Sequence, residues 1–117
     1  KAVSVWGSGT PKREFLHVDD MADASVYLMS SYDDSEIVNV GVGSDVTIRE
    51  LAETIQKVVG FEGDLQFDSS KPDGTPRKLM NVDKLSALGW HAQIALEDGI
   101  RSTYNWFLEN AADIRDK

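Results

Sequence analysis

One stretch near the start of the chain constrains the fold most, because it joins strand signals to a helix start through a turn. It covers residues 5–23 and reads VWGSGTPKREFLHVDDMAD. Residues 2–6 are rich in β formers and stop at the glycine- and proline-bearing turn 7–11. Residues 14–18 read as a second short strand. Strands of this length beside helical patterns predict a fold of the α/β class.

A first helix should begin at Asp19 or Asp20, because an aspartate side chain accepts hydrogen bonds from the unpaired amides of a first helical turn. The small and apolar side chains around and after this start recur at helical spacing and share one face. We expect this face to lie in the core: Val18, Met21, Ala22, Ser25, Leu28, Met29 and Tyr32.

The clearest helix start lies at Thr47, which forms a capping box with Glu50 ahead of an apolar stripe. Gly60 supplies the left-handed residue that ends this helix. Before the helix, residues 37–40 form a brief apolar run of the kind found in buried strands.

The second half of the chain holds a strand at residues 65–67, a short helix at 83–88 and a last helix at 96–110. The polar loop 68–78 lies between them and carries two prolines. Loops of this length in compact domains are often functional. The whole pattern predicts about three main helices with short strands.

Length and charge bound the function. The 117 residues suffice for one domain, and the net charge of −8 disfavours nucleic acid and anionic membranes as partners. Apolar runs fall far short of the ~20 residues that cross a bilayer. Without cysteine there is no disulfide and no thiolate metal site. A cytoplasmic location is the default expectation, and the start without Met indicates a piece of a longer protein.

The turn at residues 7–11 is not a dinucleotide-binding fingerprint. Gly7 and Gly9 begin a G-x-G pattern, but Lys12 stands where the third glycine belongs and a strand is expected next. We therefore predict no Rossmann site at this turn, and no Walker A pattern occurs in the sequence.

Four other polar residues have plain structural interpretations. His17 and His91 lack partners at metal-ligand spacing, so we assign no metal site to them. Asp19 and Asp20 have the composition of an acid–base pair, yet adjacent residues at a helix start are more simply caps.

Four cations stand in two glycine- and proline-bearing loops of this acidic chain: Lys12, Arg13, Arg77 and Lys78. The residues alone leave open whether these cations bind an anion or only face solvent, since loops are exposed in either case. Trp6 is equally open, because a strand-end aromatic is either a core residue or a flat platform for a base or sugar.

The motifs together resemble one enzyme family. They read, in order, VWGSGTPKREFLHVDDMA, NVG, TIRELAETI, FDSSKPDGTPRKLMNV, LGW and STYNWFLEN. This order is similar to the C-terminal half of the GDP-L-fucose synthases, which are extended short-chain dehydrogenases/reductases. The pattern GSG-x-x-x-R-x-F-x-x-V-x-D is shared among nucleotide-sugar epimerases and dehydratases, whereas the KPDGTPRK loop is typical of the fucose synthase branch.

The resemblance implies that residues 1–117 are a C-terminal nucleotide-sugar-binding domain without its Rossmann domain. The family's full-length enzyme uses NADP(H) to convert GDP-4-keto-6-deoxy-D-mannose to GDP-L-fucose by 3,5-epimerisation and 4-reduction. By the motif match, Trp6 and Arg13 line the GDP site, Lys78 reaches the diphosphate, and Asp73 contacts the nucleoside. Arg77 lies beside them.

The family's catalytic groups find no match in this chain. They are a Ser, a Tyr with a Lys four residues later, a Cys and a His. None of the three tyrosines is followed by a lysine at that spacing, cysteine is absent, and His17 does not match the catalytic His. We therefore expect no catalytic residue, no turnover and no bound NADP(H) for this chain alone.

The expected partners are a GDP-sugar, the N-terminal Rossmann domain of the same enzyme, and a second copy in a homodimer. Residues 18–32 and 37–40 should then expose apolar faces that promote association. Two alternatives stay open. One is the substrate domain of another nucleotide-sugar epimerase or dehydratase, and the other is a non-enzymatic module that binds nucleotide-sugars or serves only as structure.

Overall fold

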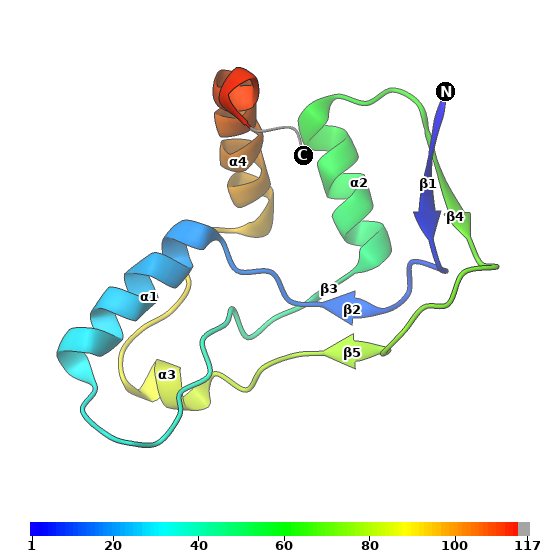
Figure 1. Cartoon of the computed structure of the whole chain (residues 1–117). Helices are drawn as coiled ribbons and strands as arrows, with labels where there is room; N and C mark the ends of the chain where they lie inside the picture. Colours follow the sequence, from blue (N-terminus) through cyan, green and yellow to red (C-terminus); the bar gives the residue numbers. More distant parts are fainter. Residues whose placement is uncertain (115–117) are drawn as a thin grey trace.

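The described part of the chain, residues 1–114 of a computed structural model, contains four helices and two small sheets (Figure 1). Three helices are long: α1 (Val18–Ser31), α2 (Ile48–Val59) and α4 (Leu96–Asn110). A short helix α3 (Asp83–Ala87) and a 3₁₀ turn (Ala111–Asp113) complete the helical elements. The expected α/β class, with about three main helices and short strands, is confirmed.

The first sheet pairs β1 (Ala2–Trp6) with β4 (Asp64–Asp68) in parallel. Both strands were expected from their β formers. Their register runs from Ala2 opposite Asp64 to Trp6 opposite Asp68, so both strands end at the same edge. The turn after β1 and the loop after β4 therefore start side by side (Figure 1).

The second sheet has β2 (Lys12–Arg13) at its centre. One neighbour is β3 (Val46–Thr47), which is antiparallel, and the other is β5 (Arg77–Lys78), which is parallel. The predicted strand at residues 14–18 is wrong, because pairing stops at Arg13. The Glu14 carboxylate, rather than a strand backbone, takes the next amides on both sides.

Residues 37–40 also form no strand. An apolar run becomes a strand only where another strand lies beside it, and none pairs with this run within residues 1–114. Side chains make the contacts instead: Lys84 Nζ donates to the Ile37 carbonyl, and Asn39 Nδ2 donates to the Asn81 carbonyl at 3.4 Å.

The cap of α1 differs from the prediction. His17 is the N-cap residue, and its Nδ1 accepts from the Asp19 amide at 3.0 Å. Asp20 is only 4% exposed and accepts from the amides of Gln93 and Ile94 at 3.1 and 3.0 Å. Asp20 therefore ties α1 to the segment before α4, and the assignment of Asp19 and Asp20 as caps is wrong.

The predicted core face of α1 is wrong for most of its residues, although Leu28 packs against the core. Met29 is 85% exposed, and Val18 and Met21 are exposed as well. The buried apolar residue of this helix is Ala24, which packs with Leu85 and Trp90 in the small core between α1 and α3. Helical spacing identified an apolar stripe, but the core contacts the side of α1 next to it.

The helices α2 and α4 match the sequence signals closely. Thr47 and Glu50 form the expected capping box, with Thr47 Oγ1 accepting from the Glu50 amide at 3.0 Å. Gly60 has a left-handed φ of 72°, as a helix end of this type requires. An apolar groove of about 580 Å³ lies between α2 and α4 and is lined by residues including Leu51, Ile55, Ile100, Tyr104 and Phe107.

Within residues 1–114 no helix is long and apolar enough to cross a bilayer.

Candidate functional site

The second sheet brings the two cation-bearing loops together. In the register of β2 and β5, Arg13 lies opposite Lys78 and Lys12 lies opposite Arg77. Side chains alternate between the two faces along a strand, so paired residues of neighbouring strands share a face. Arg13 and Lys78 thus lie on one face, and Lys12 and Arg77 lie on the other.

Arg77 has a protein partner on its face. Its Nε donates to Asp45 Oδ2 at 2.7 Å, and the Asp45 side chain is only 7% exposed. This ion pair fixes β5 against the segment that leads into β3. Of the predicted site residues, Arg77 is the one that forms an ion pair with a partner among residues 1–114.

Asp73 connects the polar loop 68–78 to the glycine turn. Its Oδ1 accepts from the Ser8 amide at 2.7 Å, and its Oδ2 accepts from Ser8 Oγ at 2.8 Å. These two bonds stabilise the carboxylate and lower the pKa of Asp73 below its ordinary value. Gly7 permits the close approach, because a Cβ there would lie 2.5 Å from Asp73 Oδ1.

Arg13 lies next to the same loop. A Cβ built on Gly74 would stand 3.8 Å from Arg13 Nη2, so the guanidinium faces the loop backbone just after Asp73. Arg13 Nη1 also donates to the Lys12 carbonyl at 2.7 Å. The glycine turn, the 68–78 loop and the Arg13–Lys78 pair thus form one cluster.

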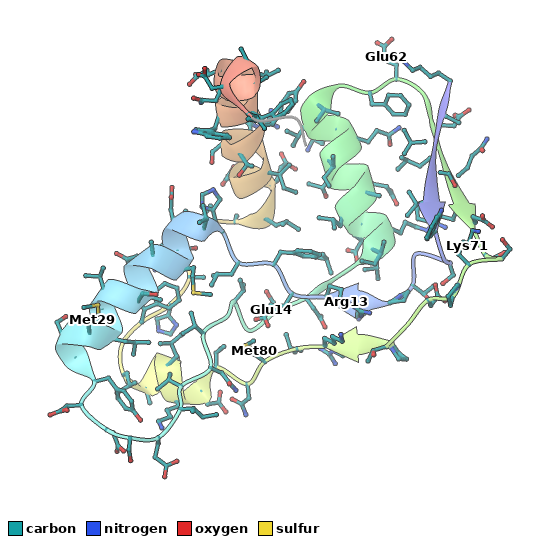
Figure 2. All side chains as sticks on the ribbon, in the orientation of Figure 1. Arg13, Glu14, Met29, Glu62, Lys71 and Met80 are labelled. Atoms are coloured by element: carbon teal, nitrogen blue, oxygen red, sulfur yellow. The ribbon has the colours of Figure 1, made fainter. Side chains whose placement is uncertain are left out.

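Trp6 stands at the edge of this cluster, at the end of β1. Its side chain is 69% exposed, so the core interpretation of this residue is wrong. The Lys71 ammonium lies 5.0 Å from the centre of its ring, at cation–π distance. Figure 2 shows Lys71 at the corner where β1 and β4 end.

Three residues of the cluster were not identified from the sequence: Ser8, Glu14 and Lys71. Ser8 lies in the turn 7–11 and Lys71 in the loop 68–78. Their place in these two loops was the only feature of the sequence that could have identified them as site residues. Glu14 has no sequence signature of its role, because its partners are backbone amides. Figure 2 shows Glu14 and Met80 close together beside Arg13.

The histidines take structural positions. His17 caps α1 and its Nε2 lies 3.2 Å from Ser102 Oγ, while His91 Nδ1 lies 3.5 Å from Ser86 Oγ. Among residues 1–114, no group of three acidic, histidine or cysteine side chains is placed to hold a metal ion.

The arrangement is suited to hold an anion. An Arg guanidinium presents a planar fork of donors, a Lys ammonium presents a point charge, and phosphate accepts both. The two cations come from strands whose backbones lie about 4.8 Å apart, as in any sheet. A ligand with two neighbouring negative groups can therefore contact both.

Comparisons with known proteins point to one group of enzymes. Residues 1–41 match the model of the NAD dependent epimerase/dehydratase family. The GDP-L-fucose synthase of Escherichia coli K12 is 58% identical over 117 aligned residues, which cover 92% of this chain and 36% of that protein.

Two solved structures show the same fold. A GDP-L-fucose synthetase from Naegleria fowleri bound to NADP superposes with a TM-score of 0.92 at 33% identity, over 98% of this chain and 37% of that one. A GDP-6-OMe-4-keto-L-xylo-heptose reductase from Campylobacter jejuni gives a TM-score of 0.88 at 39% identity, over 94% of this chain and 34% of that one.

The chain spans about a third of the length of the curated relatives it matches, rather than the half that its motifs suggested. Identity is spread over nearly the whole chain and the fold agrees throughout. By sequence and by fold, the chain is similar to about a third of the length of a GDP-L-fucose synthase.

Proposed function

We propose that this chain is the nucleotide-sugar-binding domain of a GDP-L-fucose synthase and holds the GDP diphosphate between Arg13 and Lys78. The observation that carries the proposal is the register of β2 and β5, which pairs these two residues on one face. Charge-assisted hydrogen bonds of this kind are about twice as strong as neutral ones. In a chain of net charge −8, an anion has to be held by such a local cluster.

The other predicted residues fit around the diphosphate. Trp6 offers an exposed aromatic face beside the cluster, suited to stack on a base or a sugar. Asp73 accepts two hydrogen bonds from Ser8, and a carboxylate has about four acceptor positions, so it retains capacity to accept from a nucleoside donor. Arg77, bound to Asp45, supports β5 from the other face.

The whole protein would convert GDP-4-keto-6-deoxy-D-mannose to GDP-L-fucose by 3,5-epimerisation and NADPH-dependent 4-reduction. The contacts on this chain act remotely: they hold the nucleotide so that the sugar ring is in register with the reacting groups. The proposal places those reacting groups in the Rossmann domain of the full-length enzyme, which is taken to be a homodimer. This chain alone is expected to have no turnover.

The described residues do not fit the NADP(H) that this activity requires. A dinucleotide fingerprint needs a glycine turn that opens a helix, whereas the turn at residues 7–11 leads into β2. We therefore assign no step of the cofactor chemistry to this chain.

Calorimetric titration of the chain with GDP tests the binding proposal. Arg13→Ala and Lys78→Ala should each weaken GDP binding by about 1.5 to 3 kcal/mol, the usual size of a hydrogen bond to a charged group. Arg101→Ala is the matched control, because Arg101 lies on α4 and pairs with Glu97. Wild-type chain that binds no GDP would exclude the proposal and favour a purely structural module.

A second candidate function is reduction of a different nucleotide-sugar. The likeness to a GDP-heptose reductase at 39% identity favours this alternative over a non-enzymatic module. Titration with GDP, UDP and dTDP separates the nucleotide classes, and a preference for UDP or dTDP would favour another epimerase or dehydratase. Competition between GDP-fucose and a GDP-heptose then separates the sugars.

A further inference from the structure

The side chain of Glu14 joins its own segment, next to Arg13, to residues 42–43 and to Met80. Its Oε2 accepts from the Val42 and Gly43 amides at 2.7 and 2.6 Å, and its Oε1 accepts from the Met80 amide at 3.1 Å. Two successive backbone N–H groups make a concavity suited to an anion, and here the anion is a side chain of the protein itself.

The backbone around Glu14 is shaped for this contact. Gly41 is buried, and a Cβ at this position would stand 2.6 Å from Glu14 Oε2. A larger residue would therefore push the carboxylate away from its amides. The contact is also central to the cluster, since Glu14 directly follows Arg13 in the chain.

The bond from the Met80 amide to Glu14 has the most direct effect on the position of Lys78 relative to Arg13. Met80 comes two residues after Lys78, and β5 itself has only two residues. Backbone pairing over so short a strand holds Lys78 weakly, because a ladder gains stability with each added bond. The bond from Met80 to Glu14 adds an anchor just beyond Lys78 and just beyond Arg13 (Figure 2).

We infer that Glu14 is a positioning residue for the anion site, whose carboxylate sets the place of Lys78 relative to Arg13. The inference rests on the proposed binding of a diphosphate between these two cations. Glu14 does not contact the ligand in this assignment, because its carboxylate repels phosphate and is already surrounded by three amides. It acts through Lys78.

Glu14→Gln tests this role with little change in size. One amide oxygen can still accept from Val42 and Gly43, but the NH₂ group then meets the Met80 N–H, donor against donor. The substitution therefore breaks the link on the β5 side. Glu62→Gln is the control, because Glu62 is exposed in the turn before β4, far from Glu14 (Figure 2).

The readout is a double-mutant cycle with Lys78→Ala, measured by titration with GDP and with guanosine. Glu14→Gln should weaken GDP binding about tenfold, the equivalent of one charge-assisted hydrogen bond. In the Lys78→Ala background the same change should have less than about a twofold effect, because groups that act through one another are not additive. Guanosine, which has no phosphates, should bind the single variant as it binds the wild type.

Four results overturn the inference. Equal effects of Glu14→Gln in both backgrounds, or equal loss of GDP and guanosine, would show a general structural role and leave the proposed function intact. Unchanged GDP binding by a folded Glu14→Gln chain would likewise exclude positioning. Wild-type chain without affinity for GDP would remove the proposed function and this inference together. If Glu14→Gln does not fold, Glu14→Asp retains the charge, shortens the reach to Met80 and enters the same cycle.

Discussion

At the scale of single residues, Asp73 shows how one side chain is fixed in place where the proposed function needs an acceptor. Both of its oxygens accept from Ser8, so its position relative to the glycine turn is fixed before any ligand arrives. A pre-positioned acceptor loses less conformational entropy on binding than a mobile one. The same two bonds favour the ionised carboxylate, so the stability that they contribute is lost in acid.

Stability should depend on the ionisation of Asp73. Its pKa is lowered below 3.8 in the folded chain, mainly by the Ser8 hydrogen bonds, so its contribution to stability is full above pH 3.8 and declines as the pH falls through the lowered pKa. Urea unfolding of wild type and Asp73→Asn, measured from above pH 3.8 downward, gives this contribution as the difference between their free energies of unfolding. The difference should shrink toward lower pH, whereas Glu62→Gln should differ little from wild type at every pH.

At the scale of elements, the sequence predicted a helix correctly where residues of the helix itself determine its start, its end and its apolar face. The capping box and Gly60 delimited α2, and the apolar spacing delimited α4, because each signal acts within the helix itself. The strands predicted at 14–18 and 37–40 failed because a strand depends on a distant partner. Asp20 does not cap its helix, because it accepts from the amides of Gln93 and Ile94. These amides lie more than seventy positions away, so this role also depends on a distant partner.

The candidate site also had a part that could be predicted from the sequence and a part that could not. The residue types in the two loops were compatible with an anion site without requiring one, and the resemblance named Trp6, Arg13, Asp73, Lys78 and Arg77. The pairing of Arg13 with Lys78 could not be predicted, since backbone register between segments so far apart is set by the whole fold. The role of Glu14 was equally inaccessible, because backbone amides leave no trace in a sequence.

The cap of α2 allows a direct test at this scale. Thr47→Ala removes the side chain that accepts from the Glu50 amide, and the loss of such a cap costs about 1 kcal/mol of unfolding free energy. Thr54→Ala is the matched control in the same helix, because Thr54 Oγ1 donates to the Glu50 carbonyl one turn back. Urea denaturation should show little or no loss for Thr54→Ala, and equal losses for both variants would contradict the capping account.

At the scale of the whole molecule, the chain exposes more surface than a compact protein of its size. Its accessible surface is 8385 Å², against roughly 6,300 Å² expected for a monomer of 12.9 kDa. Its radius of gyration is 17.0 Å, against about 13 Å for a compact domain of this length. Many of the exposed side chains are apolar, among them Val18, Met29, Ile37 and Trp106.

Surface of this kind should promote association of the isolated chain. We expect concentration-dependent dimers or larger species in sedimentation velocity. Met29→Glu should shift the distribution toward monomer, because Met29 is 85% exposed on α1. Ser30→Glu adds the same charge to the same helix without removing apolar surface, so it should shift the distribution less. A purely monomeric wild type at high concentration would contradict the expectation.

The bonds between Ser8 and Asp73 join positions 65 residues apart. Closing a flexible loop of that length costs about 4 kcal/mol of chain entropy. The two bonds offset this cost more easily once the intervening chain has folded and brought Ser8 and Asp73 close together. We therefore expect the candidate anion site to assemble late in folding. A ligand that bridges Arg13 and Lys78 would bind only the closed chain, and at about one hundred times its dissociation constant it would raise the unfolding free energy by about 2.7 kcal/mol. Thermal stability of this chain thereby becomes a measure of ligand affinity, independent of any catalysis.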